Sequence, residues 1–131
     1  MTIVYGPIES DSMPPQLGPY SHVVRAGNLL FTAGQAGLDP ATNAPKGNDF
    51  EPQARQAFEN LSAVLQAAGS GLQYVVKTTI FMADASNFAT LNQLFKEFFP
   101  ANPPARSVPI VNLPRGLLIS IEAIAVLPDA G

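Results

Sequence analysis

The sequence predicts an α+β fold in which two helices cover one face of a mixed sheet. The expected elements follow one another in the order βββαβαββ, and two segments show the apolar periodicity of amphipathic helices. No internal repeat or linker interrupts this order. At 131 residues the chain is long enough for one hydrophobic core but not for two, so a single domain over residues 1–131 is expected.

The N-terminal part of the chain predicts three strands. The first candidate is Thr2–Tyr5, and a surface segment rich in proline and serine, Gly6–Gly18, follows it. Strands Ser21–Ala26 and Leu29–Ala33 come next, joined at Gly27–Asn28, a pair of residues typical of hairpin turns. These two strands are therefore expected to pair with each other.

Two amphipathic helices are expected in the middle of the chain. The loop Gly34–Asn48, broken by several glycines and prolines, leads to the first of them. Apolar residues then recur at helical spacing from Ala54 to Ala68, Pro52 suits the first turn, and Gly69 suits the left-handed position that closes a helix. The second helix is expected over Asn87–Phe99, and the proline that follows ends it.

Three further strands complete the pattern. Tyr74–Met82, between the helices, is rich in β-branched and aromatic residues. Ala105–Val111 is the next strand, and Pro109 inside it indicates a sheet edge or a bulge. The last strand is Leu117–Leu127. Because the short turn Leu113–Gly116 joins these last two strands, they are expected to lie close together.

The low charge of the chain predicts a homo-oligomer. Charged residues make up only 13% of the sequence, against about 25% in typical soluble proteins, and apolar residues make up 47%. Two amphipathic helices are also too few to cover both faces of a sheet of this size. The uncovered face is therefore expected to be buried by other copies of the chain.

Composition also excludes several classes of function. The net charge is −3 and no basic stripe is visible, which argues against a nucleic-acid-binding protein. The chain has no cysteine and one histidine, His22, so disulfides, thiol nucleophiles and multi-histidine metal sites are excluded. No signal-like leader or apolar run of membrane-spanning length is present, so a cytoplasmic protein is expected.

Arg106 is the most informative single residue. It lies in the run Pro103-Pro104-Ala105-Arg106-Ser107, where a proline-stiffened approach leads into an apolar strand. A guanidinium stays charged and matches a carboxylate bidentately, so this position suits the binding of a small anion. An ion pair across a subunit contact is the alternative interpretation.

Glu122 interrupts an otherwise apolar strand. Alternation in the last strand places one set of residues on the opposite face, namely Ile119, Ile121, Ala123 and Ala125. A buried carboxylate needs a cation, a hydrogen-bond network or a solvated cleft. Arg106 is the expected partner because of the short turn between the two strands, and both a structural role and a site role for Glu122 remain open.

Four weaker candidates accompany these residues. Tyr20 lies in a rigid Gly-Pro-Tyr-Ser turn that presents its phenol at a strand start, although most tyrosines only pack. Asn92 lies off the apolar stripe of the second helix. Gly34-Gln35-Ala36-Gly37 lacks the residues of a phosphate loop, and exposed backbone N–H groups able to contact a small anion suit it better. His22 has no nearby acid, which favours a surface or packing role.

Six short motifs together resemble one known family. Each is weak alone, but they occur in order at compatible spacing over nearly the whole chain. They are Gly18-Pro19-Tyr20-Ser21, Thr32-Ala33-Gly34-Gln35, Val76-Lys77-Thr78-Thr79, the Phe88–Phe99 helix, Pro104-Ala105-Arg106-Ser107 and Ile121-Glu122-Ala123-Ile124-Ala125. On these motifs the chain resembles the RidA (YjgF) family of imine deaminases.

The resemblance implies a fold, an assembly and an activity. It implies a chorismate-mutase-like fold, a homotrimer whose sheets form a central barrel, and sites in clefts between subunits. Family members of the main type hydrolyse 2-imino acids to 2-keto acids and ammonia without a cofactor. In this chain Arg106 would clamp the substrate carboxylate, Tyr20 and Asn92 would line the cleft, and backbone N–H groups near Gly34 would help to hold the ligand.

The chain departs from the family pattern at three positions. Ala33 stands where a serine is frequent, and Val108 stands where a cysteine is common. Ser120 replaces the first glutamate of Glu-Ile-Glu-Ala, which is the one associated with the catalytic water, while Glu122 matches the second. A serine is a poor base, so the deaminase activity implied by the resemblance is in question, and Glu122 is a substitute base to consider.

These departures leave two rival hypotheses beside the deaminase. The first is a non-catalytic trimer that binds small carboxylates through Arg106. The second is the ribonuclease or translation-inhibitor role ascribed to some relatives, which the acidic composition disfavours.

Overall fold

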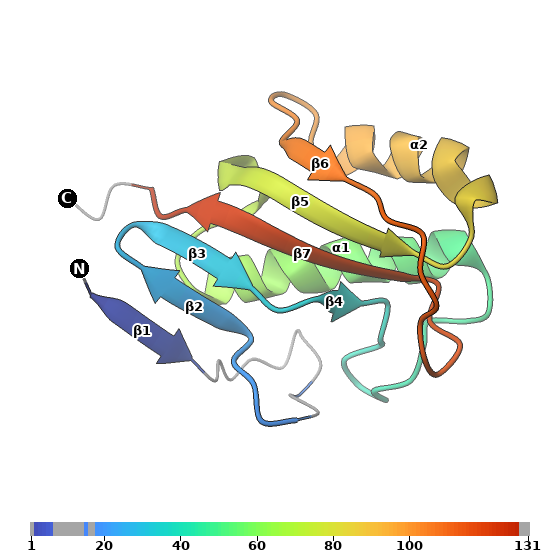
Figure 1. Ribbon diagram of the computed structural model, residues 1–131, viewed down its shortest axis with the longest axis horizontal. Coiled ribbons are helices and arrows are strands. Elements are labelled where there is room, and N and C mark those ends of the chain that lie inside the picture. The colour runs from blue at the N-terminus through green and yellow to red at the C-terminus, as the bar shows by residue number, and fades with distance from the viewer. Residues whose placement is uncertain (1, 7–14, 16–17, 129–131) are drawn as a thin grey trace.

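The computed structural model describes residues 2–6, 15 and 18–128 (Figure 1). Within these residues two α-helices and seven strands form, joined in part by two single turns of 3₁₀-helix. The elements are β1 (Ile3–Gly6), β2 (Val23–Ala26), β3 (Leu29–Thr32), β4 (Gln35–Ala36), α1 (Phe50–Ala67), η1 (Leu72–Tyr74), β5 (Val75–Met82), η2 (Ala85–Asn87), α2 (Phe88–Phe98), β6 (Ala105–Ser107) and β7 (Ile119–Val126). Most of the predicted surface segment Gly6–Gly18 lies outside the described residues.

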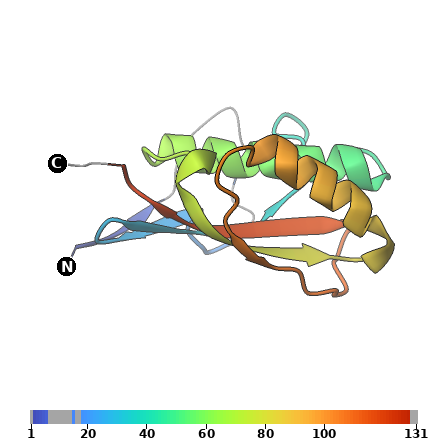
Figure 2. The ribbon, with the colours of Figure 1, turned by 90° about the horizontal axis from the view of Figure 1, so that it is seen from above.

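The strands form one mixed sheet, and both helices lie on the same side of it (Figure 2). The strand order is β1-β2-β3-β7-β5-β6, and the short β4 also pairs with β7. All pairs are antiparallel except β5–β6, which is parallel. The α+β prediction is confirmed, with β4 as one strand more than expected in the segment predicted to be loop.

The strand that contains Arg106 is shorter than predicted and has a different neighbour. β6 ends at Ser107 and not at Val111, because Pro109 has no N–H to donate to a sheet ladder. Only an isolated parallel bridge from Ile110 to Met82 continues the contact. β6 pairs with β5, so β5 separates it from β7, and the expected proximity of the last two strands is wrong.

The core lies between the sheet and the helices. β7 alternates as predicted: Ile119, Ile121, Ala123 and Ala125 are buried and face α1. Phe58 of α1 is fully buried, and its ring packs against those of Phe95 and Phe98 in α2. α1 ends as its sequence predicts, with Gly69 at φ +90° and the N–H of Ser70 bonded to the carbonyl of Leu65 at 2.8 Å.

An irregularity in the sheet lies between β3 and β4. Phe31 of β3 pairs with Ile124, whereas Gln35 of β4 pairs with Ile121, so one extra residue is inserted on this side of β7. The hydroxyl of Thr32 fills the gap by accepting a hydrogen bond from the N–H of Ala123 at 3.0 Å. This bulge brings Gly34 next to β7.

Replacing Thr32 with valine is expected to destabilise the protein by about 1–3 kcal/mol, because the buried N–H of Ala123 loses its acceptor while the side-chain volume is kept. Chemical denaturation measures the effect. Thr32→Ser retains the hydroxyl and should cost clearly less. Equal losses in both variants would contradict a role for this hydrogen bond.

The other face of the sheet is not covered by a helix (Figure 2). Phe31 of β3 pairs with Ile124 of β7, and their side chains share this face. Phe31 is 40% exposed, and Val76 of β5 is 49% exposed. None of the described helices is long and apolar enough to cross a membrane.

Candidate functional site

Arg106 is held by two residues of α2. Its Cα lies opposite that of Thr78 in β5, which places its side chain on the helix-covered face of the sheet. There an Nη2–H donates to Asn92 Oδ1 at 2.6 Å, and the guanidinium carbon lies 4.9 Å from the centre of the Phe95 ring. Stacking on the ring and a neutral acceptor fix the guanidinium without neutralising its charge. These three residues are called the arginine group below.

A carboxylate caps η2, the 3₁₀ turn that precedes α2. η2 leads directly into α2, and the carboxylate of Asp84 accepts the N–H of Ser86 at 2.8 Å. This backbone hydrogen bond, together with one from the Ser86 side chain, lowers the pKa of Asp84 below its ordinary value. The cap therefore helps to fix the turn that leads into α2, the helix that carries Asn92.

Replacing Asp84 with alanine is expected to lower the midpoint of thermal unfolding at pH 7. Because the pKa of Asp84 is lower in the folded than in the unfolded protein, its stabilising effect is complete above the unfolded pKa of about 3.8. The effect is lost as the pH falls through the folded pKa. The gap between the variant and the wild type should therefore narrow in melting curves recorded at progressively lower pH, and a constant gap would contradict this prediction.

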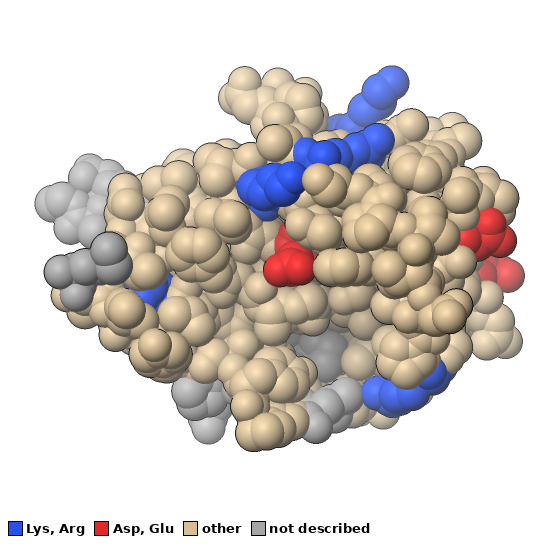
Figure 3. Space-filling view, viewed as in Figure 1, with Lys and Arg blue, Asp and Glu red and all other residues tan. Residues whose placement is uncertain are grey.

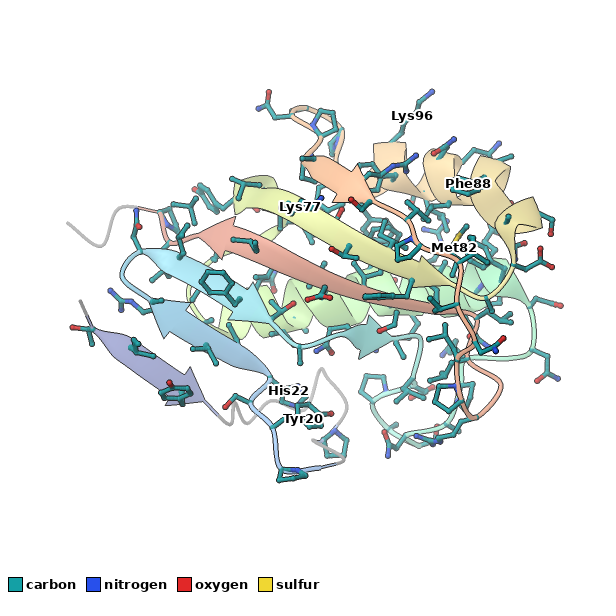
Figure 4. The ribbon with its side chains drawn as sticks, viewed as in Figure 1. Tyr20, His22, Lys77, Met82, Phe88 and Lys96 are labelled. Atoms are coloured by element: carbon teal, nitrogen blue, oxygen red, sulfur yellow. The ribbon has the colours of Figure 1, made fainter. Side chains whose placement is uncertain are left out.

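A second group of predicted residues lines a pocket at the other side of β7. The pocket has a volume of about 350 Å³ and is lined by Tyr20, His22 and Ser120 and by parts of two loops, residues 34–38 and 113–117. It is called the Ser120 pocket below. Tyr20 packs edge-on against His22, with ring centres 6.1 Å apart, and Figure 4 shows the two side chains together. His22 is buried, in line with the predicted packing role.

Gly34 and Ser120 meet at the wall of this pocket. A Cβ atom built on Gly34 would lie 2.7 Å from Ser120 Oγ, so the absence of a side chain lets the backbone approach the hydroxyl. Ala33, the residue before, bonds through its N–H to the carbonyl of His22 at 2.8 Å and does not itself line the pocket. The chain thus brings Tyr20, Gly34 and Ser120 together, but it does not bring them to Arg106 or Asn92.

The predicted pairing of Glu122 with Arg106 is wrong within one chain. Glu122 lies opposite Thr79 of β5, whereas Arg106 lies opposite Thr78, and adjacent residues of a strand point to opposite faces. Glu122 therefore lies on the open face and Arg106 on the helix-covered face. Among the described residues the ion pairs are Lys46–Asp39 and Arg55–Glu97.

Sequence reasoning missed two buried amides of α1, Gln53 and Asn60. Both are fully buried and hydrogen-bonded to the loops that line the Ser120 pocket. The available signal was an amide side chain on the same face of the helix as the apolar stripe. Among the described residues there is no cluster of histidine, cysteine, aspartate and glutamate that could hold a metal ion.

The sequence comparison identifies the family. The family model described as endoribonuclease L-PSP matches residues 10–127. The chain belongs to the endoribonuclease L-PSP family. This is the family of RidA and YjgF, so the resemblance seen in the six motifs is confirmed.

Relatives in the endoribonuclease L-PSP family carry several names. A mouse protein named 2-iminobutanoate/2-iminopropanoate deaminase is 38% identical over 126 residues, which cover 95% of this chain and 93% of the mouse protein. The crystal structure of RidA from the bacterium Psychrobacter has a TM-score of 0.86 and 39% identity, and covers 91% of this chain and 97% of that one. Escherichia coli TdcF, solved with bound serine, has a TM-score of 0.84 and 38% identity, with coverages of 91% and 96%.

Proposed function

We propose that this protein hydrolyses 2-imino acids of the 2-iminobutanoate and 2-iminopropanoate type to 2-keto acids and ammonia, as a cytoplasmic enzyme without a cofactor. The arginine group carries the proposal. Arg106 is bonded to a neutral amide oxygen and stacked on a ring, so its guanidinium retains the positive charge and the free donors that a substrate carboxylate requires. The name of the mouse relative and the serine bound to TdcF support an amino-acid-like ligand.

The complete site is proposed to form between subunits of a homotrimer. Within one chain the arginine group and the Ser120 pocket belong to different sides of β7, and no residue of the first lines the second. The uncovered apolar face of the sheet supports assembly, because partially exposed side chains such as Phe31 and Val76 would be buried there. In such an assembly Arg106 of one subunit would face Tyr20, Gly34 and Ser120 of the next.

The proposed reaction needs little chemistry from the protein. Arg106 would bind the carboxylate and so orient the adjacent C=N bond, and Asn92 and Tyr20 would limit its movement. Water then adds to the imine carbon and one of its protons passes to the nitrogen, which gives a carbinolamine. The remaining hydroxyl proton then passes to the nitrogen as well, and ammonia leaves as the C=O bond forms. An imine is already electrophilic, so positioning supplies much of the rate.

The mechanism also needs a group that accepts and returns a proton, and position 120 carries no carboxylate for this role. The hydroxyl of Ser120 can hold a water molecule at the wall of the pocket but is a poor base at neutral pH. Glu122 lies two residues further along the same face of β7 and is the carboxylate nearest in sequence. We propose it as the substitute acceptor of the proton, with Ser120 holding the water.

Ser120 also favours a second candidate, a trimer that binds small carboxylates without turnover. The anion-binding residues would be retained and only the activating acid lost. RNA binding is disfavoured by the net charge of −3, although several basic side chains lie close together along the upper edge of the face drawn in Figure 3.

One assay separates these functions. The protein is added to an amino-acid oxidase or threonine dehydratase reaction, and the decay of the released imine is followed by trapping with semicarbazide. Faster decay than in buffer supports the deaminase. No acceleration together with calorimetric binding of 2-ketobutyrate supports the carboxylate-binding protein, and absence of both overturns both. Light scattering on the same sample measures the oligomeric state.

A further inference from the structure

α1 presents two buried amides toward the segments that line the Ser120 pocket. Gln53 and Asn60 are two turns apart and so lie on the same face of the helix. Both are fully buried, and a buried amide is costly unless its donors and acceptor are bonded. Their bonding partners therefore indicate what these two residues are for.

Gln53 binds the loop that forms one wall of the pocket. Its Nε2 donates to the carbonyl of Gly116 at 3.2 Å, and its Oε1 accepts the N–H of Leu118 at 2.8 Å. The same Nε2 also donates to the carbonyl of Gly47 at 2.9 Å. Between these anchors Arg115 and Gly116 both have positive φ, and the N–H of Leu117 bonds to the carbonyl of Pro114 at 3.0 Å. The tight turn is thus fixed at its base by one side chain.

Asn60 binds the other segment that lines the pocket, β4 and the residues after it. Its Nδ2 donates to the carbonyl of Ala36 at 3.0 Å and to that of Leu38 at 2.8 Å, while its Oδ1 accepts from Gln56 Nε2 at 2.9 Å. Gly37, between the two bonded carbonyls, lies directly against α1, and a Cβ atom there would overlap the backbone carbonyl of Gln53. The backbone of this wall therefore packs directly against the backbone of the helix, with no side chain between them.

We propose that Gln53 and Asn60 are positioning residues of the deaminase site, an inference that rests on the proposed function. Together they fix the two walls of the Ser120 pocket to one rigid helix. The pairing of β4 with β7 places Gly34 beside Ser120, and the two amides fix the pocket walls around that pair. A displacement of about 1 Å at reacting groups costs up to about a hundredfold in rate, so loosening either wall should slow catalysis beyond any loss of stability.

The test replaces Gln53 with methionine, which preserves length and approximate volume but removes all three hydrogen bonds. Gln66→Met on the same helix is the matched control, because Gln66 is exposed and bonds only to Ser62 among the described residues. Each variant is assayed for kcat and KM well below its melting midpoint, and hydrogen exchange of the Leu118 amide is measured by NMR.

The expected result for Gln53→Met is a loss of about tenfold or more in kcat/KM of the folded protein, with faster exchange at Leu118. Gln66→Met should match the wild type in both. A folded Gln53→Met variant with wild-type kcat and KM, however much its melting midpoint falls, overturns the proposal. If that variant does not fold, Gln53→Asn retains an amide one methylene shorter, and the same criterion applies to it.

The same experiment gives a different result if the wild-type protein has no deaminase activity. If the wild type hydrolyses no imine but binds 2-ketobutyrate, the deaminase is excluded, and the dissociation constant of 2-ketobutyrate becomes the readout. A weakening of about tenfold in Gln53→Met supports positioning of a binding site, and an unchanged constant overturns it. If the wild type neither hydrolyses imines nor binds 2-ketobutyrate, both proposals fail.

Discussion

Replacing Arg106 with alanine is expected to lower kcat/KM for 2-iminobutanoate by about a thousandfold. The guanidinium is proposed to make two charge-assisted hydrogen bonds to the carboxylate, and such bonds contribute about 1.5–3 kcal/mol each. Its position on Phe95 and beside Asn92 is already fixed before the ligand arrives, so little ordering cost offsets this gain. Initial rates of imine decay with semicarbazide trapping measure the loss.

Two variants test the reason for that loss. Arg106→Lys keeps the charge but not the planar fork, so it should recover only part of the rate. Arg25→Ala removes a cation from β2, where the arginine bonds its Nε–H to the carbonyl of Gly27, and should leave the rate unchanged. A fully active Arg106→Ala protein would exclude Arg106 as the carboxylate-binding residue.

Introducing a carboxylate at position 120 is expected to raise kcat by about a hundredfold. A positioned general base contributes about 10²–10⁴ in rate, and the proposed substitute Glu122, two residues further along β7, is expected to supply only part of that effect. The longer side chain of Ser120→Glu can extend into the pocket of about 350 Å³ that Ser120 already lines. Wild-type and variant proteins are compared in the same assay at several concentrations of 2-iminobutanoate, so that kcat and KM are separated.

The matched control is Ser120→Gln, which has the size of the glutamate without its basicity. It should show no gain in kcat. If Ser120→Glu is no faster than the wild type although the wild type is active, the proton acceptor lies elsewhere. Glu122→Gln should then abolish the activity. If neither substitution changes kcat, neither residue is the base.

Local patterns in the sequence predicted most of the elements but not the position of β6. The apolar stripe from Ala54 to Ala68 and the alternation in β7 both reflect burial on one face, and burial is what the structure confirms. β6 pairs in parallel with β5 although α2 separates the two strands in the sequence. The apolar periodicity of a single segment carries no information about such a pairing. The short turn before β7 predicted β6 as the neighbour of β7, but the two strands are not adjacent in the sheet.

The structure brings together only some of the candidate site residues, for a similar reason. Arg106 and Asn92 were both singled out, and the structure brings them into contact. The expected partner of Arg106 was instead Glu122, because strand adjacency was inferred from chain adjacency. Gln53 and Asn60 lie on the same helix face as the apolar stripe, which indicates burial, but the sequence does not show which backbone groups their amides bond.

The ring of Phe95 belongs both to the aromatic core and to the arginine group. It packs against Phe58 and Phe99, with ring centres 6.4 Å and 4.7 Å away, and it also contacts the guanidinium of Arg106. Any substitution that repacks this aromatic cluster therefore also moves the arginine. Because the arginine proposed to bind the substrate carboxylate rests on a ring of the core, sequence variation at these rings should be narrower than stability alone requires.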